Sequence, residues 1–168
     1  MFVLARAITY STLFIGLLLV FLPARVLERA GVRPPAALGP AQVMGLALGA
    51  TGALLALACI LTFVTIGKGT PAPFDPPRKL VVAGPYRVMR NPMYAGAGLA
   101  LAGAAIYTGS WGLFAYALGF LIAAHLFVVG YEEPHLLRRF GADYESYAAS
   151  TSRWLPRWRS LPGKGRPS

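Results

Sequence analysis

Residues 41–66 read AQVMGLALGATGALLALACILTFVTI and contain no charged side chain. As an α-helix, these 26 residues would extend roughly 39 Å, enough to cross the hydrocarbon core of a bilayer with some tilt. Gly45, Gly49 and Ala53 place small side chains four residues apart, a spacing that lets a second helix approach closely. The stretch therefore predicts a membrane-spanning helix.

Three further apolar runs lie on either side of this stretch: Phe2–Leu22, Pro92–Tyr107 and Trp111–Tyr131. The first resembles a signal peptide in outline, but no small-residue cleavage site follows and residues 23–25 read as a helix exit, so we expect a retained helix. Only residues 108–110 separate the last two runs, which predicts an antiparallel hairpin. Gly96, Ala100 and Ala104 should face the partner helix.

The composition also favours a lipid environment. The chain is 56% hydrophobic and 13% charged, whereas a soluble domain carries roughly a quarter charged residues. The net charge of +10 comes from basic residues that lie outside the apolar runs, near their ends. This pattern is typical of membrane flanks and disfavours a nucleic-acid partner. We expect an all-α integral membrane bundle of four transmembrane helices with a C-terminal amphipathic interfacial helix.

Four spans would place both termini on one side of the membrane, together with the loop between the second and third spans. That side holds thirteen of the 16 lysines and arginines, which predicts that it faces the cytoplasm of a bacterial-type inner or plasma membrane. We expect an N-terminal transmembrane hairpin over 1–66, a core of loop, hairpin and C-terminal helix over 67–156, and a flexible basic tail over 157–168.

The loop before the third span holds the first candidate site. Its four prolines between residues 71 and 77 favour an extended path, and it carries no phosphate-binding loop or dinucleotide fingerprint. Asn91 and Pro92 read as an N-cap and first residue of a helix, whose free N–H groups attract an anion. The alternative is an ordinary capped helix with Arg87 and Arg90 at the membrane surface.

The second candidate site is the pair Glu132 and Glu133, at the end of the fourth span. Adjacent carboxylates at the end of a membrane helix are costly unless hydrated or paired, so one of them could bind an ammonium group. The alternative is that both cap a following surface helix that ends at Phe140, before Gly141. Tyr144 and Tyr147 follow at a spacing that puts them on one helix face.

Two other side chains are candidates for chemistry. His125 is ionisable within a span, which suggests function, yet one histidine without a second ligand is more often a hydrogen-bonded contact between helices. Cys59 is the only cysteine, so the chain has no internal disulfide. These residues give too few ligands for a metal site, and none is expected.

Four motifs in order resemble the isoprenylcysteine carboxyl methyltransferase and phospholipid methyltransferase group of membrane enzymes. They are Gly84-Pro85-Tyr86, Arg90-Asn91-Pro92-Met93-Tyr94, Glu132-Glu133-x-x-Leu136 and Phe140-Gly141-x-x-Tyr144-x-x-Tyr147. The likeness runs over about 67–156.

The resemblance implies a pocket for S-adenosylmethionine at the cytoplasmic face, closed by the C-terminal segment. It implies that Arg78, Lys79, Leu80 and Val81 line the adenosine end, with Tyr86 packed nearby. It also implies that the methionine part is held by Arg90, Asn91, Pro92, Met93 and Tyr94, and that Glu132, beside Glu133, takes the ammonium group. The start of the third span and the acid pair should then converge around one zwitterionic guest.

The acceptor follows less directly from the resemblance. Many relatives have histidine at Asn91, and isoprenylcysteine enzymes carry an arginine for the substrate carboxylate at the position of Val128. We therefore expect a lipophilic acceptor from the bilayer, methylated on a carboxylate, amine or thiol. Residues that could contact it are His125, Tyr131, Tyr144 and Tyr147.

Three other classes compete with this reading. Membrane sterol reductases share a similar C-terminal arrangement and use a nicotinamide cofactor, but they are much longer. A small cation-coupled exporter would need an acid within a span, and no Asp or Glu lies inside the apolar runs. A membrane scaffold without a ligand would leave the acid pair only a capping role.

Overall fold

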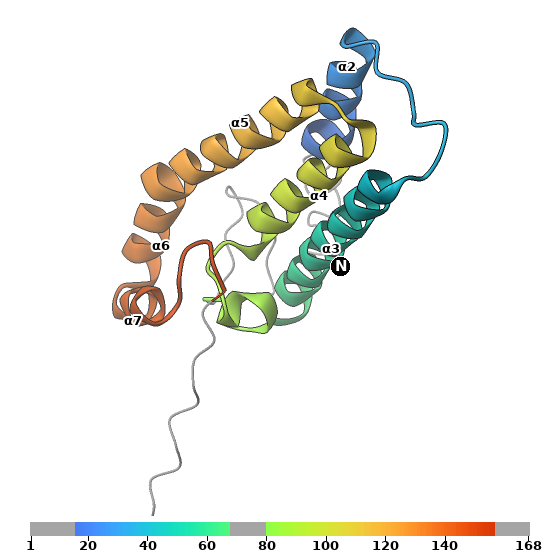
Figure 1. Cartoon of the computed structure of the whole chain (residues 1–168). Helices are drawn as coiled ribbons and strands as arrows, with labels where there is room; N and C mark the ends of the chain where they lie inside the picture. Colours follow the sequence, from blue (N-terminus) through green and yellow to red (C-terminus); the bar gives the residue numbers. More distant parts are fainter. Residues whose placement is uncertain (1–15, 68–79, 157–168) are drawn as a thin grey trace, which may run out of the picture.

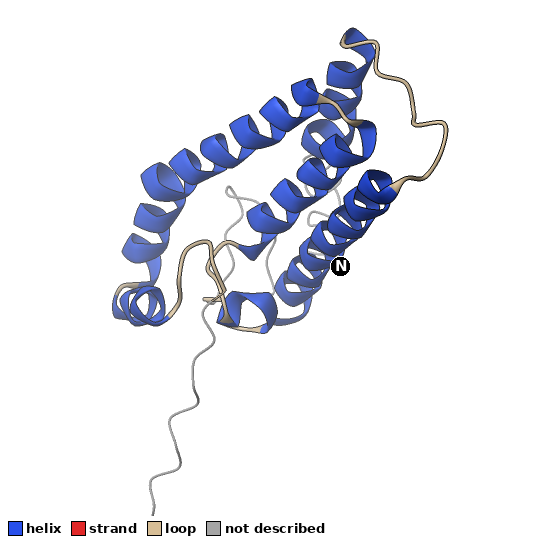
Figure 2. Cartoon of the chain, in the orientation of Figure 1, coloured by secondary structure: helices blue, strands red, loops and turns tan. Residues whose placement is uncertain are grey.

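The computed structural model describes residues 16–67 and 80–156, and within them the chain is helical without a β-strand (Figures 1 and 2). The only extended pairing there is an isolated parallel bridge between Met89 and Ser152. The elements are η1 (Gly16–Phe21), α2 (Leu22–Arg29), α3 (Pro40–Thr62), η2 (Phe63–Gly67), η3 (Gly84–Arg87), α4 (Pro92–Thr108), α5 (Trp111–Phe127), η4 (Val128–Glu132), α6 (Glu133–Phe140) and α7 (Ala142–Ser150).

Helices α3 and α4 pack against each other through glycines on both. A Cβ on Gly45 would lie 2.6 Å from the backbone nitrogen of Tyr107, and a Cβ on Gly96 would lie 2.8 Å from the carbonyl oxygen of Gly52. Such contacts leave no room for a side chain, so the two backbones approach as small residues allow. The prediction is correct for Gly45 as a close-contact position, but Ala53 is exposed, and Gly96 meets α3 instead of the other helix of the hairpin. Gly52 is a further glycine of α3 at which an added Cβ would collide with α4.

The predicted hairpin of the third and fourth spans is confirmed by α4 and α5. Its turn has Gly109 in the left-handed region, at φ 64°, and the hydroxyl of Ser110 accepts a hydrogen bond from the backbone N–H of Leu113. This cap starts α5 immediately after α4 ends. From the turn, the two helices diverge toward their other ends (Figure 1).

The acid pair lies inside a continuous helical rod, not between two helices as predicted. Helix α5 runs into η4 and α6 without a break, from Trp111 to Phe140. Pro134 has no N–H to donate, and a π-helical turn over 128–132 precedes it. This wider turn changes the hydrogen-bond register, so the rod continues past the proline. The predicted end is correct, since Gly141 stops the rod with φ 51°.

The first predicted span lies largely outside the described residues. Its described end, η1, continues directly into α2, so residues 23–25 do not form the predicted helix exit. Pro23 follows the π-helical turns of η1, and the wider turns shift the hydrogen-bond register before a residue that has no N–H to donate.

Two helical stretches are long and apolar enough to cross a membrane, Pro40–Ile66 with 27 residues and Trp111–Phe140 with 30. Only 17% and 22% of their most apolar windows are buried within the molecule. A core helix of a soluble protein is mostly buried, so these exposed apolar surfaces suit lipid contact. Helix α4 has 17 residues, and the four predicted spans are not all established.

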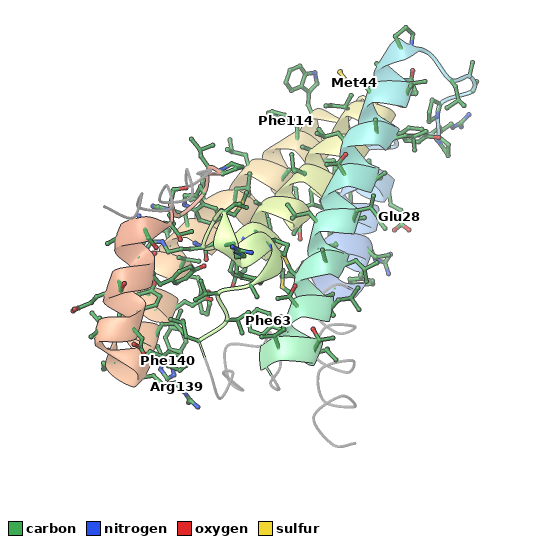
Figure 3. All side chains as sticks on the ribbon, turned by 90° about the horizontal axis from the view of Figure 1, so that it is seen from below. Glu28, Met44, Phe63, Phe114, Arg139 and Phe140 are labelled. Carbon is green, nitrogen blue, oxygen red and sulfur yellow. The ribbon has the colours of Figure 1, made fainter. Side chains whose placement is uncertain are left out.

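One end of the bundle gathers the segments that carry the predicted motifs. Phe63 lies at the same end as Arg139 and Phe140, away from Met44 at the start of α3 (Figure 3). There η3 and the start of α4 lie against the end of α3, in a core cluster of Cys59, Val81 and Tyr86. This end positions the candidate site.

Candidate functional site

Tyr94 and Glu132 connect the separated ends of α4 and α5. The Tyr94 hydroxyl donates a hydrogen bond to Oε2 of Glu132 at 3.2 Å, across 38 positions of sequence. Tyr94 stands in the first turn of α4 and Glu132 is the last residue of η4. Both side chains are partly buried. The start of the third predicted span and the acid pair therefore converge, as the sequence predicted.

Glu133 is held by two arginines. The guanidinium of Arg153 donates from Nε and from a terminal nitrogen to the two carboxylate oxygens of Glu133, at 2.8 Å each. A terminal nitrogen of Arg90 lies 3.3 Å from the same carboxylate. The side chains of Glu133 and Arg90 are only 17% and 15% exposed, so the pairing compensates charges that are largely removed from water. A bidentate pair of this kind fixes orientation as well as charge.

The two neighbouring acids therefore differ in their surroundings. Among the described residues, no lysine or arginine pairs with Glu132, which has the neutral hydroxyl of Tyr94 as its hydrogen-bond donor. Glu133 has its charge compensated. A partly buried carboxylate with a neutral donor suits an incoming cation, whereas one already clamped by guanidinium groups does not.

The segment after α7, Thr151–Pro156, crosses the site and is called the strap below. The backbone N–H of Arg90 donates to the carbonyl of Ser152 at 2.9 Å, and the side-chain amide of Asn91 donates to the carbonyl of Arg153 at 3.2 Å. The indole of Trp154 donates to Nδ1 of His125 at 3.1 Å. The strap thus contacts α5 and the two residues that precede α4, and it turns back from α7 toward the start of α4 (Figure 2).

These contacts correct two predictions. Asn91 occupies the N-cap position of α4, but its side chain makes no capping hydrogen bond because the amide is directed to the strap. His125 is exposed, and its hydrogen-bond partner is Trp154 of the strap instead of another membrane helix. The sequence analysis did not predict roles for Arg153 and Trp154. The available signal was an arginine and a tryptophan shortly after the helix of Tyr147, because side chains of this size often make tertiary contacts.

Tyr86 and Tyr147 form a buried support beneath the site. The Tyr147 hydroxyl donates to the backbone carbonyl of Tyr86 at 2.7 Å, and the Tyr147 ring lies 6.3 Å from that of Tyr144. The predicted shared face of Tyr144 and Tyr147 on α7 is confirmed, since both are buried there. Burial raises the pKa of Tyr86 and of Tyr147 above the ordinary tyrosine value, because their ionised forms would lose hydration.

The remaining predicted residues are placed as follows. Arg78 and Lys79 lie outside the described residues. Val81 and Pro92 are buried, and Leu80 and Met93 are partly buried. Tyr131 is exposed, with its ring stacked on Phe127 and on His135. Phe127 also lines an apolar cavity next to Tyr94, and the contact of Tyr131 with an acceptor stays a prediction.

An apolar cavity of about 480 Å³ adjoins the site. Its walls come from the N-terminal helical segment, α4 and α5: Leu18, Leu22, Tyr94, Tyr116, Gly119, Phe120, Ala123, Ala124 and Phe127. Tyr94 lines the cavity and also reaches Glu132, so one residue belongs to both. Its volume is in the range of small-molecule sites.

The fold and site define a helical membrane protein whose polar residues meet at one end of an apolar bundle. The family model described as phospholipid methyltransferase matches residues 40–143, from the first residue of α3 to just after the rod of α5 and α6. The match covers more than half of the chain, and the protein belongs to the phospholipid methyltransferase family. A comparison with curated proteins found no match.

This membership confirms the resemblance drawn from the motifs. The family is one of methyltransferases that act on membrane lipids, which supports an enzymatic role. Together with the two exposed apolar helices, it indicates an integral membrane protein. The matched stretch includes Tyr94, Glu132 and Glu133, whereas the strap lies beyond it.

Proposed function

We propose that the protein transfers a methyl group from S-adenosylmethionine to a lipophilic acceptor at the cytoplasmic face of the membrane. The observation that carries the proposal is the hydrogen bond between Tyr94 and Glu132, which sets a partly buried carboxylate without a described cationic partner beside the start of α4. S-adenosylmethionine, when bound, supplies an electrophilic methyl group on a sulfonium centre.

The residues present suit the zwitterionic end of this cofactor. Glu132 accepts hydrogen bonds from the ammonium group, replacing the hydration that its burial removes. The backbone N–H groups of Met93 and Tyr94, in the first turn of α4, have no carbonyl one turn back within the helix, and they suit the carboxylate. The aromatic face of Tyr94 attracts the positive charge of a sulfonium.

Catalysis in this proposal is mainly positioning. An in-line displacement at a methyl group needs donor and acceptor aligned, and holding them so removes much of the barrier. No residue is assigned as a general base. Val81 and Tyr86 support the adenosine end from the buried cluster, as the family resemblance implies, together with Arg78, Lys79 and Leu80.

The apolar cavity supports a lipophilic acceptor. Its lining is hydrocarbon and aromatic apart from the hydroxyls of Tyr94 and Tyr116, and Tyr116 donates to the carbonyl of Leu18. An apolar chain in the cavity would bring its polar end to Tyr94, next to the donor site. The accepting atom in this proposal is an oxygen, nitrogen or sulfur at that polar end.

The proposed topology has four spans with both termini in the cytoplasm. The site end of the described structure carries five arginines: Arg87, Arg90, Arg138, Arg139 and Arg153. The opposite end carries Arg25, Arg29 and Arg33. The positive-inside rule favours the site end as cytoplasmic. Labelling of a cysteine introduced at Ala142 or at Ala37, in a Cys59→Ala background, from either side of sealed vesicles tests this.

Replacing Glu132 tests the proposed function directly. A charge-assisted hydrogen bond contributes about 1.5–3 kcal/mol, so Glu132→Gln should weaken S-adenosylmethionine binding by at least about tenfold. The matched control is Glu28→Gln, because Glu28 is an exposed acid of α2, remote from the site (Figure 3), and its surface pair with Arg25 contributes little.

The measurement is equilibrium titration of the purified protein in detergent with S-adenosylmethionine, followed by transfer of labelled methyl groups to lipid extracts. A parallel titration with a reduced nicotinamide dinucleotide tests the reductase alternative. Absence of S-adenosylmethionine binding by the unaltered protein would remove the proposal, and equal affinity of the Glu132→Gln and Glu28→Gln variants would show that the ammonium site lies elsewhere.

A further inference from the structure

Side-chain contacts join the diverging ends of α4 and α5 at the candidate site. Midway along the hairpin the two helices pack closely, with Leu121 directly against Gly98. At the site end they have diverged (Figure 1), and their connections there include the Tyr94–Glu132 hydrogen bond and the ion pair between Arg90 and Glu133. A site formed between diverging helices needs a tie to keep its two walls at a fixed separation.

Arg153 of the strap contacts both walls. Its guanidinium grips the carboxylate of Glu133, at the start of α6, through two hydrogen bonds of 2.8 Å. Its backbone carbonyl accepts a hydrogen bond of 3.2 Å from the side-chain amide of Asn91, which immediately precedes α4. One residue therefore connects the acid-bearing wall with the helix start across the opening.

The neighbours of Arg153 reinforce the same connection. The carbonyl of Ser152 accepts from the backbone N–H of Arg90, and the indole of Trp154 donates to His125 on α5. Arg153, which contacts both walls, therefore stands between a neighbour that contacts the α4 side and one that contacts α5. Three consecutive strap residues, 152–154, therefore make hydrogen bonds to other parts of the molecule.

The charge balance gives Arg153 a second effect on the site. Arg153 and Arg90 both pair with Glu133, whereas no lysine or arginine of the described residues pairs with the adjacent Glu132. Without Arg153, Glu133 keeps only the contact with Arg90 at 3.3 Å, and its carboxylate gains freedom to turn beside Glu132. Two mobile like charges would then repel and compete for one ammonium group.

We propose that Arg153 is a positioning residue for the methyl-donor site, acting through Glu133 and Asn91 to hold the start of α4 and Glu132 at the separation that the donor requires. The inference rests on the proposed function. Neither the family match, which ends at residue 143, nor the motifs of the sequence assign a role to this arginine. Its planar fork is what the bidentate contact needs, and a lysine supplies only a point charge.

The test compares Arg153→Gln, Arg153→Lys and the control Arg25→Gln, which removes an exposed arginine paired with Glu28 on α2. Binding of S-adenosylmethionine and methyl-transfer kinetics are measured for each, with helix content and melting temperature in detergent. Arg153→Gln should raise the KM for S-adenosylmethionine about fivefold or more with kcat within about twofold, because bound donor at saturation restores the separation of the two walls and the cost appears as lost binding energy. Arg153→Lys should fall between Arg153→Gln and the unaltered protein, and Arg25→Gln should match the latter.

A double-mutant cycle with the milder Arg153→Lys covers the case in which Arg153→Gln fails to fold. Arg153→Lys and Glu133→Gln should each weaken donor binding, and the double variant should lose clearly less than the sum of the two effects, since both changes break the same pair. Equal KM values for Arg153→Gln and the unaltered protein, or fully additive losses in the double variant, would overturn the positioning role. Failure of the unaltered protein to bind S-adenosylmethionine would instead overturn the proposed function, so the two failures are distinct.

Discussion

The hydroxyl of Tyr94 donates to the carboxylate of Glu132 at 3.2 Å, although the two residues belong to different legs of a hairpin and are 38 positions apart. The same tyrosine lines the apolar cavity. Tyr94 is therefore shared by the proposed donor site and the proposed acceptor site. The residue lines the cavity, and its hydroxyl orients the acid.

Tyr94→Phe should weaken binding of S-adenosylmethionine while leaving the fold intact. The substitution keeps the ring, so cavity shape is retained, but it removes the donor that orients Glu132. Loss of one hydrogen bond to a charged group costs about 1.5–3 kcal/mol, which predicts an affinity lower by at least about tenfold. Titration of the detergent-solubilised variant measures this.

The matched control is Tyr107→Phe, the same change near the opposite end of α4. It should leave donor affinity unaltered. If both variants lose affinity equally, the effect comes from the helix as a whole and the orienting role of the Tyr94 hydroxyl is wrong.

Filling the apolar cavity should impair the acceptor and spare the donor. Ala123 lines the cavity from α5, so Ala123→Phe places a ring where an acceptor chain is proposed. We expect the rate of methyl transfer to the lipid extract to fall about tenfold or more, because overfilling a site excludes its ligand sterically, with S-adenosylmethionine affinity unchanged.

Ala115→Phe is the control for this change, since Ala115 is an exposed residue of the same helix that does not line the cavity. It adds the same apolar bulk toward lipid. Normal methyl transfer by Ala123→Phe would mean that the acceptor does not use this cavity.

The helices could be predicted from the sequence because they follow from local patterns. The length of the apolar run 41–66 predicts α3, and the three-residue gap between the last two runs predicts the hairpin. Gly141 predicts the end of α6, because glycine readily adopts a positive φ. The continuous rod through Glu132 was not predicted, because Pro134 reads locally as a helix start and the π-helical turn that accommodates it has no simple sequence signal.

The candidate site could be predicted only in part, for a physical reason. Tyr94, Glu132 and Glu133 stand at ends of apolar runs, where polar side chains are conspicuous, and the hairpin topology brings them together. The strap contacts were missed because Arg153 binds Glu133 twenty positions away through a segment with no periodic pattern. Contacts made by a segment without regular secondary structure depend on the folded helices around it and not on local conformational preference.

The packing of α3 on α4 predicts different effects for two glycines that look equivalent in sequence. A Cβ on Gly45 would collide with the backbone of α4, at 2.6 Å from the nitrogen of Tyr107, whereas a Cβ on Gly49 would lie at an ordinary 4.0 Å from the carbonyl of Ala100. Gly45→Ala should therefore destabilise the protein by about 1–3 kcal/mol, the typical cost of overpacking. Gly49→Ala should be neutral or slightly stabilising, because alanine is the better helix former.

Reversible unfolding in mixed micelles with increasing sodium dodecyl sulfate measures both variants. Equal midpoints for Gly45→Ala and Gly49→Ala would contradict the register of the two helices. The comparison needs no ligand, so it tests the fold independently of any proposal about methyl transfer.

Alkaline pH should weaken the support formed by Tyr86 and Tyr147. Burial raises the pKa of both tyrosines above that of an exposed tyrosine, which is about 10. An unfolded chain would ionise these groups first, so the unfolding free energy should be unaffected by them below about pH 10 and should fall as pH rises further toward the folded-state pKa.

Tyr147→Phe removes one ionising group and its hydrogen bond to the carbonyl of Tyr86, so stability at neutral pH should drop by about 1 kcal/mol while the alkaline decline becomes shallower. Unfolding midpoints between pH 8 and pH 11, with Tyr107→Phe as the reference variant, measure both effects, and an unchanged alkaline slope in Tyr147→Phe would show that this buried tyrosine does not govern the decline.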